Sequence, residues 1–176
     1  ARNPGSEPLP PLTTLEEAFG VIGSHGVMVN IDLKDDRCIE GVVELIRQHD
    51  LASAVLITGC RAQRADLVRA AAPELPVLLA VDLPEEEEDA DAYLRSVDDA
   101  CRTATEHQCC GLNVPFERAR AELVEQARRR FLPVSVWTVD ARSDMERLID
   151  IGTHSITTRR PRALAKVLGR ATAKAV

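Results

Sequence analysis

The sequence predicts an α/β protein built on a parallel sheet, because two kinds of segment alternate along it. Short aliphatic runs, typical of strands that are buried on both faces, are separated by longer amphipathic stretches with helical spacing. Strand followed by helix, repeated about six times, is the pattern of βα units. Aromatic residues make up only 3% of the 176 residues, so aliphatic side chains must fill the core.

The expected elements follow one another in strict alternation after a first helix. The strands are predicted at Val27–Leu33, Ala54–Thr58, Val77–Val81, Gly111–Val114, Val134–Thr138 and Ser155–Thr158. The helices are predicted at Leu15–Ile22, Ile39–His49, Arg64–Ala71, Ala90–His107, Arg118–Arg130, Asp144–Ile151 and Pro161–Ala175.

Helix start signals support three of these helices. Thr14 and Glu17 form a Thr-x-x-Glu capping box before the first helix. Ser143 is a candidate N-cap for the helix that begins at Asp144. Pro161 suits the first turn of the last helix, where a missing N–H costs nothing.

Two architectures fit this pattern. An open, doubly wound sheet is favoured by length, because the eight-fold barrel typically needs ~250 residues. No Gly-x-Gly-x-x-Gly or Walker loop supports a nucleotide-binding version of the open sheet. Both architectures bind ligands at the C-terminal ends of their strands. The polar and small candidates at those ends are Asp32, Lys34, Thr58, Gly59, Asp82, Asn113, Trp137, Thr138, Asp140, Thr157 and Thr158.

The composition restricts the partners and the compartment. A net charge of −6 argues against a nucleic-acid partner, which needs a basic stripe. No apolar run approaches the ~20 residues of a transmembrane helix. The cysteines form no CxxC pair, which favours reduced thiols in a cytoplasmic protein, with Cys109 and Cys110 as half-buried strand residues. The five are Cys38, Cys60, Cys101, Cys109 and Cys110.

The chain is expected to divide into two parts. Residues 1–12 form a polar, proline-rich arm without the apolar stretch of a signal peptide. Residues 13–176 carry all the predicted strands and helices and form the folded domain.

The first predicted strand ends in the most informative motif, Asn30-Ile31-Asp32-Leu33-Lys34. Residues two apart on a strand share a face, so Asn30, Asp32 and Lys34 point one way. A metal would suit the carboxylate and a phosphate oxygen would suit the ammonium. A plain Asp–Lys ion pair at a strand end explains the same spacing.

Two later segments complete the set. Trp137, in Val136-Trp137-Thr138-Val139-Asp140, is placed to form the wall of a pocket for an apolar or glycerol-like group, although a rim Trp without that role is common. The second segment runs from Gly152 to Pro161, where Gly152 is expected to end a helix. His154 in this turn reads as structural rather than catalytic.

Taken in order, these segments resemble the glycerophosphodiester phosphodiesterase family. Asn30 to Lys34 is similar to that family's Asn-Ile-Glu-Ile-Lys strand, and Val136 to Asp140 to its Trp-Thr-Val-Asn segment. The stretch 11–19 resembles its Pro-x-Leu-Glu-Glu helix opening, and 152–161 resembles its Gly-Val-Asp-Gly-Ile-Ile-Thr-Asp-x-Pro. The resemblance runs from about Pro10 to Leu164.

The resemblance implies a TIM-type (β/α) barrel, of which the chain would supply about strands three to eight. It implies a phosphoric diester hydrolase that converts a glycerophosphodiester and water to glycerol 3-phosphate and an alcohol, in glycerol and lipid metabolism. It also implies a divalent metal, Mg²⁺ or Ca²⁺, with Asp32 as one of three carboxylate ligands. Lys34 corresponds to the catalytic lysine beside the phosphate, and Trp137 to a substrate-binding aromatic on the glycerol side.

The sequence also departs from the family pattern. The His-Arg-Gly, Pro-Glu-Asn-Thr and Glu-x-Asp motifs and the second His of the family's first two βα units do not occur in this sequence. We therefore expect a fragment that is inactive alone and that self-associates or needs the N-terminal part of the barrel. The alternative is a non-catalytic barrel relative that binds a phosphate ligand or a protein partner.

Overall fold

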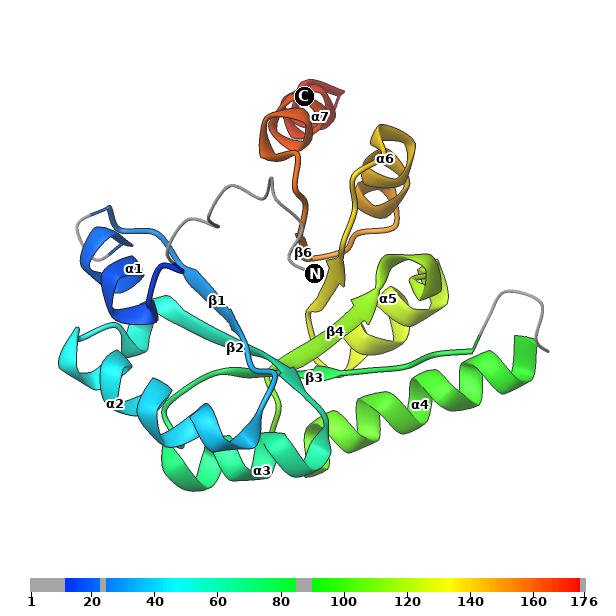
Figure 1. Cartoon of the computed structure of the whole chain (residues 1–176). Helices are drawn as coiled ribbons and strands as arrows, with labels where there is room; N and C mark the ends of the chain where they lie inside the picture. Colours follow the sequence, from blue (N-terminus) through cyan, green and yellow to red (C-terminus); the bar gives the residue numbers. More distant parts are fainter. Residues whose placement is uncertain (1–11, 23–24, 85–89, 175–176) are drawn as a thin grey trace, which may run out of the picture.

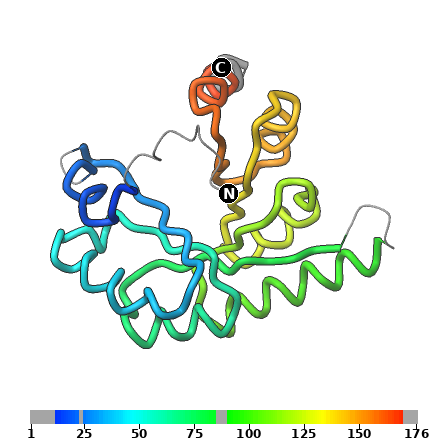
Figure 2. The backbone as a smooth tube through the Cα atoms, viewed as in Figure 1, coloured from blue at the N-terminus to red at the C-terminus, as the bar shows by residue number. Residues whose placement is uncertain are grey.

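In the computed structural model, which describes residues 12–22, 25–84 and 90–174, six parallel strands form one sheet (Figure 1). Their spatial order, β1-β2-β3-β4-β5-β6, is the order of the chain. This order excludes the doubly wound alternative, in which the strand order reverses at a switch point. The sheet curls into an arc, as the backbone trace in Figure 2 shows. The expected incomplete TIM-type barrel is therefore confirmed.

The strands are short and the helices between them run back along the outer face. The strands are β1 (Val29–Asp32), β2 (Val55–Cys60), β3 (Val77–Ala80), β4 (Gly111–Pro115), β5 (Val134–Trp137) and β6 (Ser155–Ile156). The helices are α1 (Leu15–Ile22), α2 (Ile39–Gln48), α3 (Ala62–Ala71), α4 (Ala90–Glu106), α5 (Ala121–Arg129), α6 (Arg142–Asp150) and α7 (Pro161–Lys174).

The local signals at the helix starts had different outcomes. The capping box of α1 is confirmed, because the Thr14 N–H donates to Glu17 Oε2 at 2.8 Å and the Glu17 N–H donates to Thr14 Oγ1 at 3.2 Å. The Ser143 cap is wrong, because α6 begins at Arg142, two residues before the predicted start, with extended Ala141 as its N-cap. The helix predicted from Arg118 begins at Ala121, because Ala119 is extended and separates it from a short 3-10 turn.

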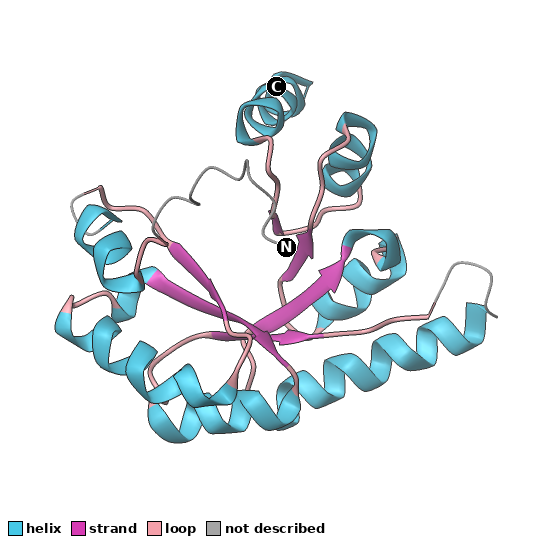
Figure 3. Ribbon diagram, viewed as in Figure 1, coloured by secondary structure: helices cyan, strands magenta, loops and turns pink. Residues whose placement is uncertain are grey.

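The core lies between the sheet and the helices, which cover the convex face of the arc (Figure 3). Aliphatic residues from alternate strand positions pack there, as the composition predicted, with Phe19 and Tyr93 as the large aromatic members. Fully buried examples from the strands are Val55, Ile57, Leu112, Val114 and Val136.

The arc does not close. Within the described residues β1 pairs only with β2 and β6 only with β5, and α1 and α7 lie at opposite ends of the arc (Figure 1). The first and last strands are therefore edge strands with backbone groups open to pairing. Exposed apolar side chains lie on the β1 side, where Val27 is 50% and Met28 is 70% exposed.

Three further expectations concern composition and the N-terminus. No helix in the described parts of the chain is long and apolar enough to span a membrane. All five cysteines are free thiols. Cys109 and Cys110 precede β4 instead of lying in it, and of these two Cys109 is buried and Cys110 is exposed. The proline-rich arm falls outside the described residues except for Leu12.

Candidate functional site

A cavity of about 620 Å³ lies on the sheet face opposite the helices, at the C-terminal ends of the strands. This volume is within the ~300–1,000 Å³ of typical small-molecule sites. Its position is the edge at which parallel α/β folds bind ligands. The lining residues are Asn30, Asp32, Lys34, Thr58, Gly59, Ala80, Asn113, Trp137, Thr138 and Thr157.

Asp32 and Lys34 lie together at this mouth, as their spacing predicted. Asp32 ends β1 and Lys34 follows it, and Lys34 Nζ is 2.6 Å from Asp32 Oδ2. The plain ion pair that the sequence left open is therefore present, inside the cavity. Their side chains are 51% and 81% exposed, respectively, so the pair adds little to stability, and its charges remain accessible to a ligand.

Neutral polar groups surround this pair. The Thr58 hydroxyl on β2 donates to Asn30 Oδ1 on β1 at 2.7 Å, which fixes the orientation of the Asn30 amide. The β1–β2 register that pairs Asp32 with Thr58 brings these side chains together. Asn113 of β4 and Thr157 after β6 complete the polar lining. The cavity is thus equipped to bind hydroxyl and phosphate oxygens.

Trp137 forms the aromatic part of the wall. It is the last residue of β5, is 42% exposed and lines the cavity, and its peptide bond to Thr138 is cis. Trp137 therefore lies in the wall of a cavity, whereas its contact with a glycerol-like group stays a prediction. An exposed indole at a polar mouth offers a face for the C–H groups of a polyol and an N–H donor at its edge.

Other candidates at the strand ends do not join the cavity. Asp82 pairs with Arg61 at 2.6 Å and lines a separate depression. Asp140 accepts from the Thr158 hydroxyl at 3.2 Å and from the Arg159 N–H at 2.9 Å, so these residues brace the loop after β6.

His154 is at the opposite end of the sheet. Its backbone N–H donates to Val134 O at 2.8 Å, and the residue lines an apolar cavity of about 280 Å³ with Phe131 and Gly152. Val134 begins β5, so this second cavity is at the N-terminal ends of the strands, away from Asp32 and Lys34. The structural reading of His154 agrees with this position.

Among the described residues that line the cavity, only the Asp–Lys pair offers general acid–base groups. None of these residues is a His, and Asp32 is the one carboxylate among them. Nearby Cys60 does not act as a nucleophile at neutral pH, because burial raises the pKa of its thiol to about 12.

A divalent metal does not fit the lining residues by themselves. No group of three His, Cys, Asp or Glu side chains within the described ranges is arranged to hold a metal ion. Asp32 is the one carboxylate among the described lining residues, and its Oδ2 already contacts the Lys34 ammonium. Hard cations such as Mg²⁺ and Ca²⁺ need several oxygen ligands.

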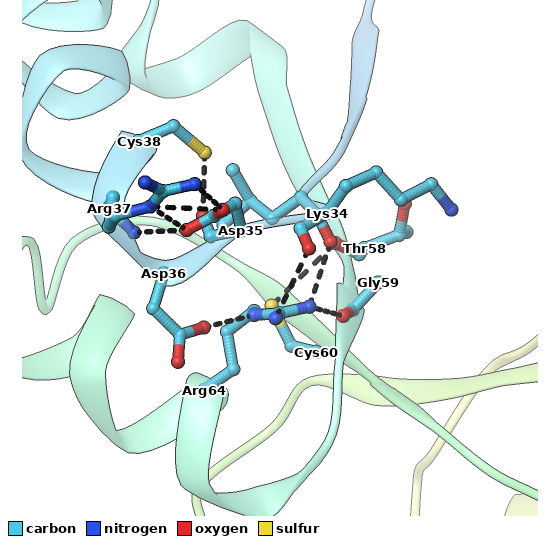
Figure 4. A network of polar contacts seen from close by, with 10 residues as sticks. Lys34, Asp35, Asp36, Arg37, Cys38, Thr58, Gly59, Cys60 and Arg64 are labelled. Atoms are coloured by element: carbon cyan, nitrogen blue, oxygen red, sulfur yellow. Dashed lines mark hydrogen bonds and ion pairs between the residues drawn. The ribbon is translucent and has the colours of Figure 1, made fainter.

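The sequence did not reveal the structural roles of two residues, Gly59, which lines the cavity, and Arg64, which lies behind it. Gly59, at φ +76°, lies against the Asp32 carboxylate, and Arg64 of α3 binds the ends of both β1 and β2 (Figure 4). No pattern distinguishes this arginine from others in the first turn of a helix, so only the fold reveals its role.

The chain is similar in sequence to known proteins of one family. The profile described as the glycerophosphoryl diester phosphodiesterase family matches residues 6–163. A glycerophosphodiester phosphodiesterase from Caldanaerobacter subterraneus subsp. tengcongensis is 25% identical over 162 residues, which are 89% of this chain and 62% of that protein. The chain therefore spans less than two thirds of the length of this relative.

Solved structures show the same fold. The Oleispira antarctica phosphodiesterase in complex with the product sn-glycerol-3-phosphate superposes with a TM-score of 0.72 at 19% identity, over 88% of this chain and 60% of that chain. A glycerophosphodiester phosphodiesterase from Parabacteroides distasonis gives a TM-score of 0.68 at 17% identity, over 89% and 64% of the two chains. The half-barrel arc is thus similar to part of complete structures.

Proposed function

Because the chain belongs to the glycerophosphoryl diester phosphodiesterase family, we propose that its cavity is part of a glycerophosphodiester phosphodiesterase site. The reaction would be hydrolysis of a glycerophosphodiester to glycerol 3-phosphate and an alcohol. The observation that carries the proposal is the convergence of Asp32, Lys34 and Trp137 on one cavity from strands that are distant in the sequence.

Each of these residues has a role that its position supports. The Lys34 ammonium would bind a phosphate oxygen, exchanging its contact with Asp32 for one with the ligand. The Trp137 indole would lie against the glycerol carbons, and Asn30 and Thr157 are placed to bind hydroxyl groups. Together they would hold the phosphate and glycerol of the substrate, leaving the alcohol group unspecified.

A divalent metal, Mg²⁺ or Ca²⁺, belongs to the proposal only with ligands beyond the described residues. Asp32 would be the carboxylate ligand that the described residues supply. When bound, such a metal would polarise the phosphate. The chain's own residues, Lys34 above all, would bind and orient the substrate.

The purified chain is expected to show no hydrolysis of glycerophosphocholine above background with Mg²⁺ or Ca²⁺. The reason is that the lining residues within the described ranges include no His and one carboxylate, and loss of a general acid or base alone typically costs ~10²–10⁴ in rate. Release of choline and glycerol 3-phosphate is the measurement. Metal-dependent turnover that is lost in Lys34→Met would contradict the expected inactivity and support hydrolysis by these residues alone.

The second candidate is a non-catalytic relative that binds a phosphate ligand or a protein partner through the same cavity. In its favour, the part of the lining that the structure describes includes neither a His nor a carboxylate besides Asp32. Binding of sn-glycerol 3-phosphate to the chain supports either function. The two functions can be distinguished by joining the chain to the N-terminal part of a barrel and measuring hydrolysis. Only the enzyme would then gain turnover.

We also expect the isolated chain to self-associate unless the N-terminal part of the barrel covers its open side. The support is the open β1 edge with exposed Val27 and Met28 beside it. Light scattering coupled to size exclusion should give a mass that rises with protein concentration. A monomer at every concentration that binds no hydrophobic dye would contradict this.

The metabolic setting follows from the proposed substrate. A glycerophosphodiesterase would act in glycerol and lipid metabolism. Five free cysteines support a reducing compartment, so we place the protein in the cytoplasm.

A further inference from the structure

Behind the cavity, one side chain ties together the backbone that carries the proposed site residues. Arg64 lies in the first turn of α3, directly after β2. Its Nη1 donates to Leu33 O at 3.0 Å and to Gly59 O at 2.8 Å, and its Nη2 is 3.5 Å from Lys34 O. Its Nε binds the Asp36 carboxylate (Figure 4). One guanidinium thus joins the ends of β1 and β2 and the turn before α2.

The bonded carbonyls belong to the same short stretch that presents Asp32 and Lys34. The Leu33 N–H donates to Thr58 O at 2.9 Å, so Leu33 is held by β2 on its amide side and by Arg64 on its carbonyl side. Leu33 is itself buried. Consecutive side chains on an extended strand point to opposite faces, so fixing Leu33 fixes the direction of its two neighbours.

Gly59 shows independently how closely this backbone is packed. A Cβ built on Gly59 would lie 2.3 Å from Asp32 Oδ1 and 2.4 Å from Leu33 O. The Asp32 carboxylate therefore rests against the Gly59 backbone, whose carbonyl accepts a hydrogen bond from Arg64. Arg64 thus binds the same residue against which Asp32 packs.

We propose that Arg64 is a positioning residue of the cavity, which aims Asp32 and Lys34 at the ligand by holding Leu33, Lys34 and Gly59 through their carbonyl oxygens. The inference rests on the proposed function for the identity of the ligand. Arginine suits this role because its rigid fork reaches several acceptors at once, which a lysine does not.

The test compares Arg64→Met with Arg47→Met. Arg47 is a matched control, because its Nη2 also binds a carboxylate, Glu74 at 2.8 Å, and a carbonyl, Ala71 O at 3.1 Å, but neither partner belongs to the ends of β1 or β2. Two readouts are measured for each protein: amide hydrogen exchange at Leu33 and the Kd for sn-glycerol 3-phosphate. Arg64→Lys serves as the milder variant in case Arg64→Met does not fold.

Arg64→Met should speed Leu33 exchange and weaken ligand binding, each by about tenfold, the size expected when charged hydrogen bonds are lost. Exchange at Leu112, whose N–H binds Pro133 O at 2.9 Å in the β4 region, should stay unchanged. Arg64→Lys should give the same pattern at smaller size, and Arg47→Met should change neither readout. Variants of Arg64 that match Arg47→Met in both readouts would overturn the proposal.

Failure of the proposed function gives a different result. If the unchanged chain does not bind sn-glycerol 3-phosphate, the ligand assignment is wrong, and Leu33 exchange alone decides whether Arg64 positions the strand end. Faster exchange confined to Leu33 and its neighbours would support positioning, and uniform or unchanged exchange would refute it.

Discussion

Gly59→Ala is expected to lower the free energy of unfolding by about 3 kcal/mol or more, since two costs combine. Gly59 has φ +76°, a conformation that costs other residues roughly 1–2 kcal/mol. Its new Cβ would also overlap Asp32 Oδ1 and the backbone oxygen of Leu33. The backbone at the end of β1 cannot move aside without breaking its bonds to Thr58 and Arg64. Urea denaturation followed by circular dichroism measures the loss.

Two other glycines separate these costs. Gly152 has φ +86°, but the nearest atom to its Cβ is Val124 Cγ1 at 3.8 Å, so Gly152→Ala should cost only about 1 kcal/mol. Gly41 lies inside α2 with nothing within 4 Å, and Gly41→Ala should stabilise the protein by up to about 1 kcal/mol. A loss at Gly59 no larger than at Gly152 would show that the β1 end is not packed against Gly59 as described.

Lys34→Met is expected to weaken binding of sn-glycerol 3-phosphate by at least about tenfold, because Lys34 is the one cation among the described residues that line the cavity. Stability should change by no more than about 1 kcal/mol, since the ion pair with Asp32 is largely exposed. Trp137 is the single Trp of the chain, so its fluorescence reports binding at this cavity.

Arg61→Met is the matched control for this measurement. Arg61 also pairs with an aspartate at a strand end, Asp82 at 2.6 Å, but that pair lines a different depression. Its removal should leave the affinity within about twofold of the unchanged chain, because a screened charge outside the cavity contributes little. Equal losses in the two variants would mean that general positive charge, and not Lys34, attracts the ligand.

The order of strands and helices could be predicted from the sequence, because short aliphatic runs indicate strands of a parallel sheet and amphipathic stretches indicate the helices between them. The cavity positions of Asp32, Lys34 and Trp137 could also be predicted, since strand alternation and the common C-terminal edge fix them without knowledge of packing. The residues at which strands begin and end were predicted less accurately. The strand predicted from Val27 begins at Val29, because Gly26 adopts φ +61° and the following residues are exposed.

The contacts between elements could not be predicted, because they depend on the curvature of the sheet. Asp82 follows a strand like Asp32, yet it turns to Arg61 outside the cavity. Arg64 sits on a helix of ordinary composition, and only the fold brings three carbonyls to it. Ser143 follows the rules of a cap, but the helix starts before it.

The most direct test of the proposed site is a titration of the ¹⁵N-labelled chain with sn-glycerol 3-phosphate, followed by NMR. The cavity assignment predicts saturable shifts of the Lys34 and Thr157 amides and of the Trp137 indole N–H, with none around Phe131 and His154 at the opposite end of the sheet. Shifts confined to the Phe131 cavity, or no saturable shift at Lys34 and Trp137, would contradict it.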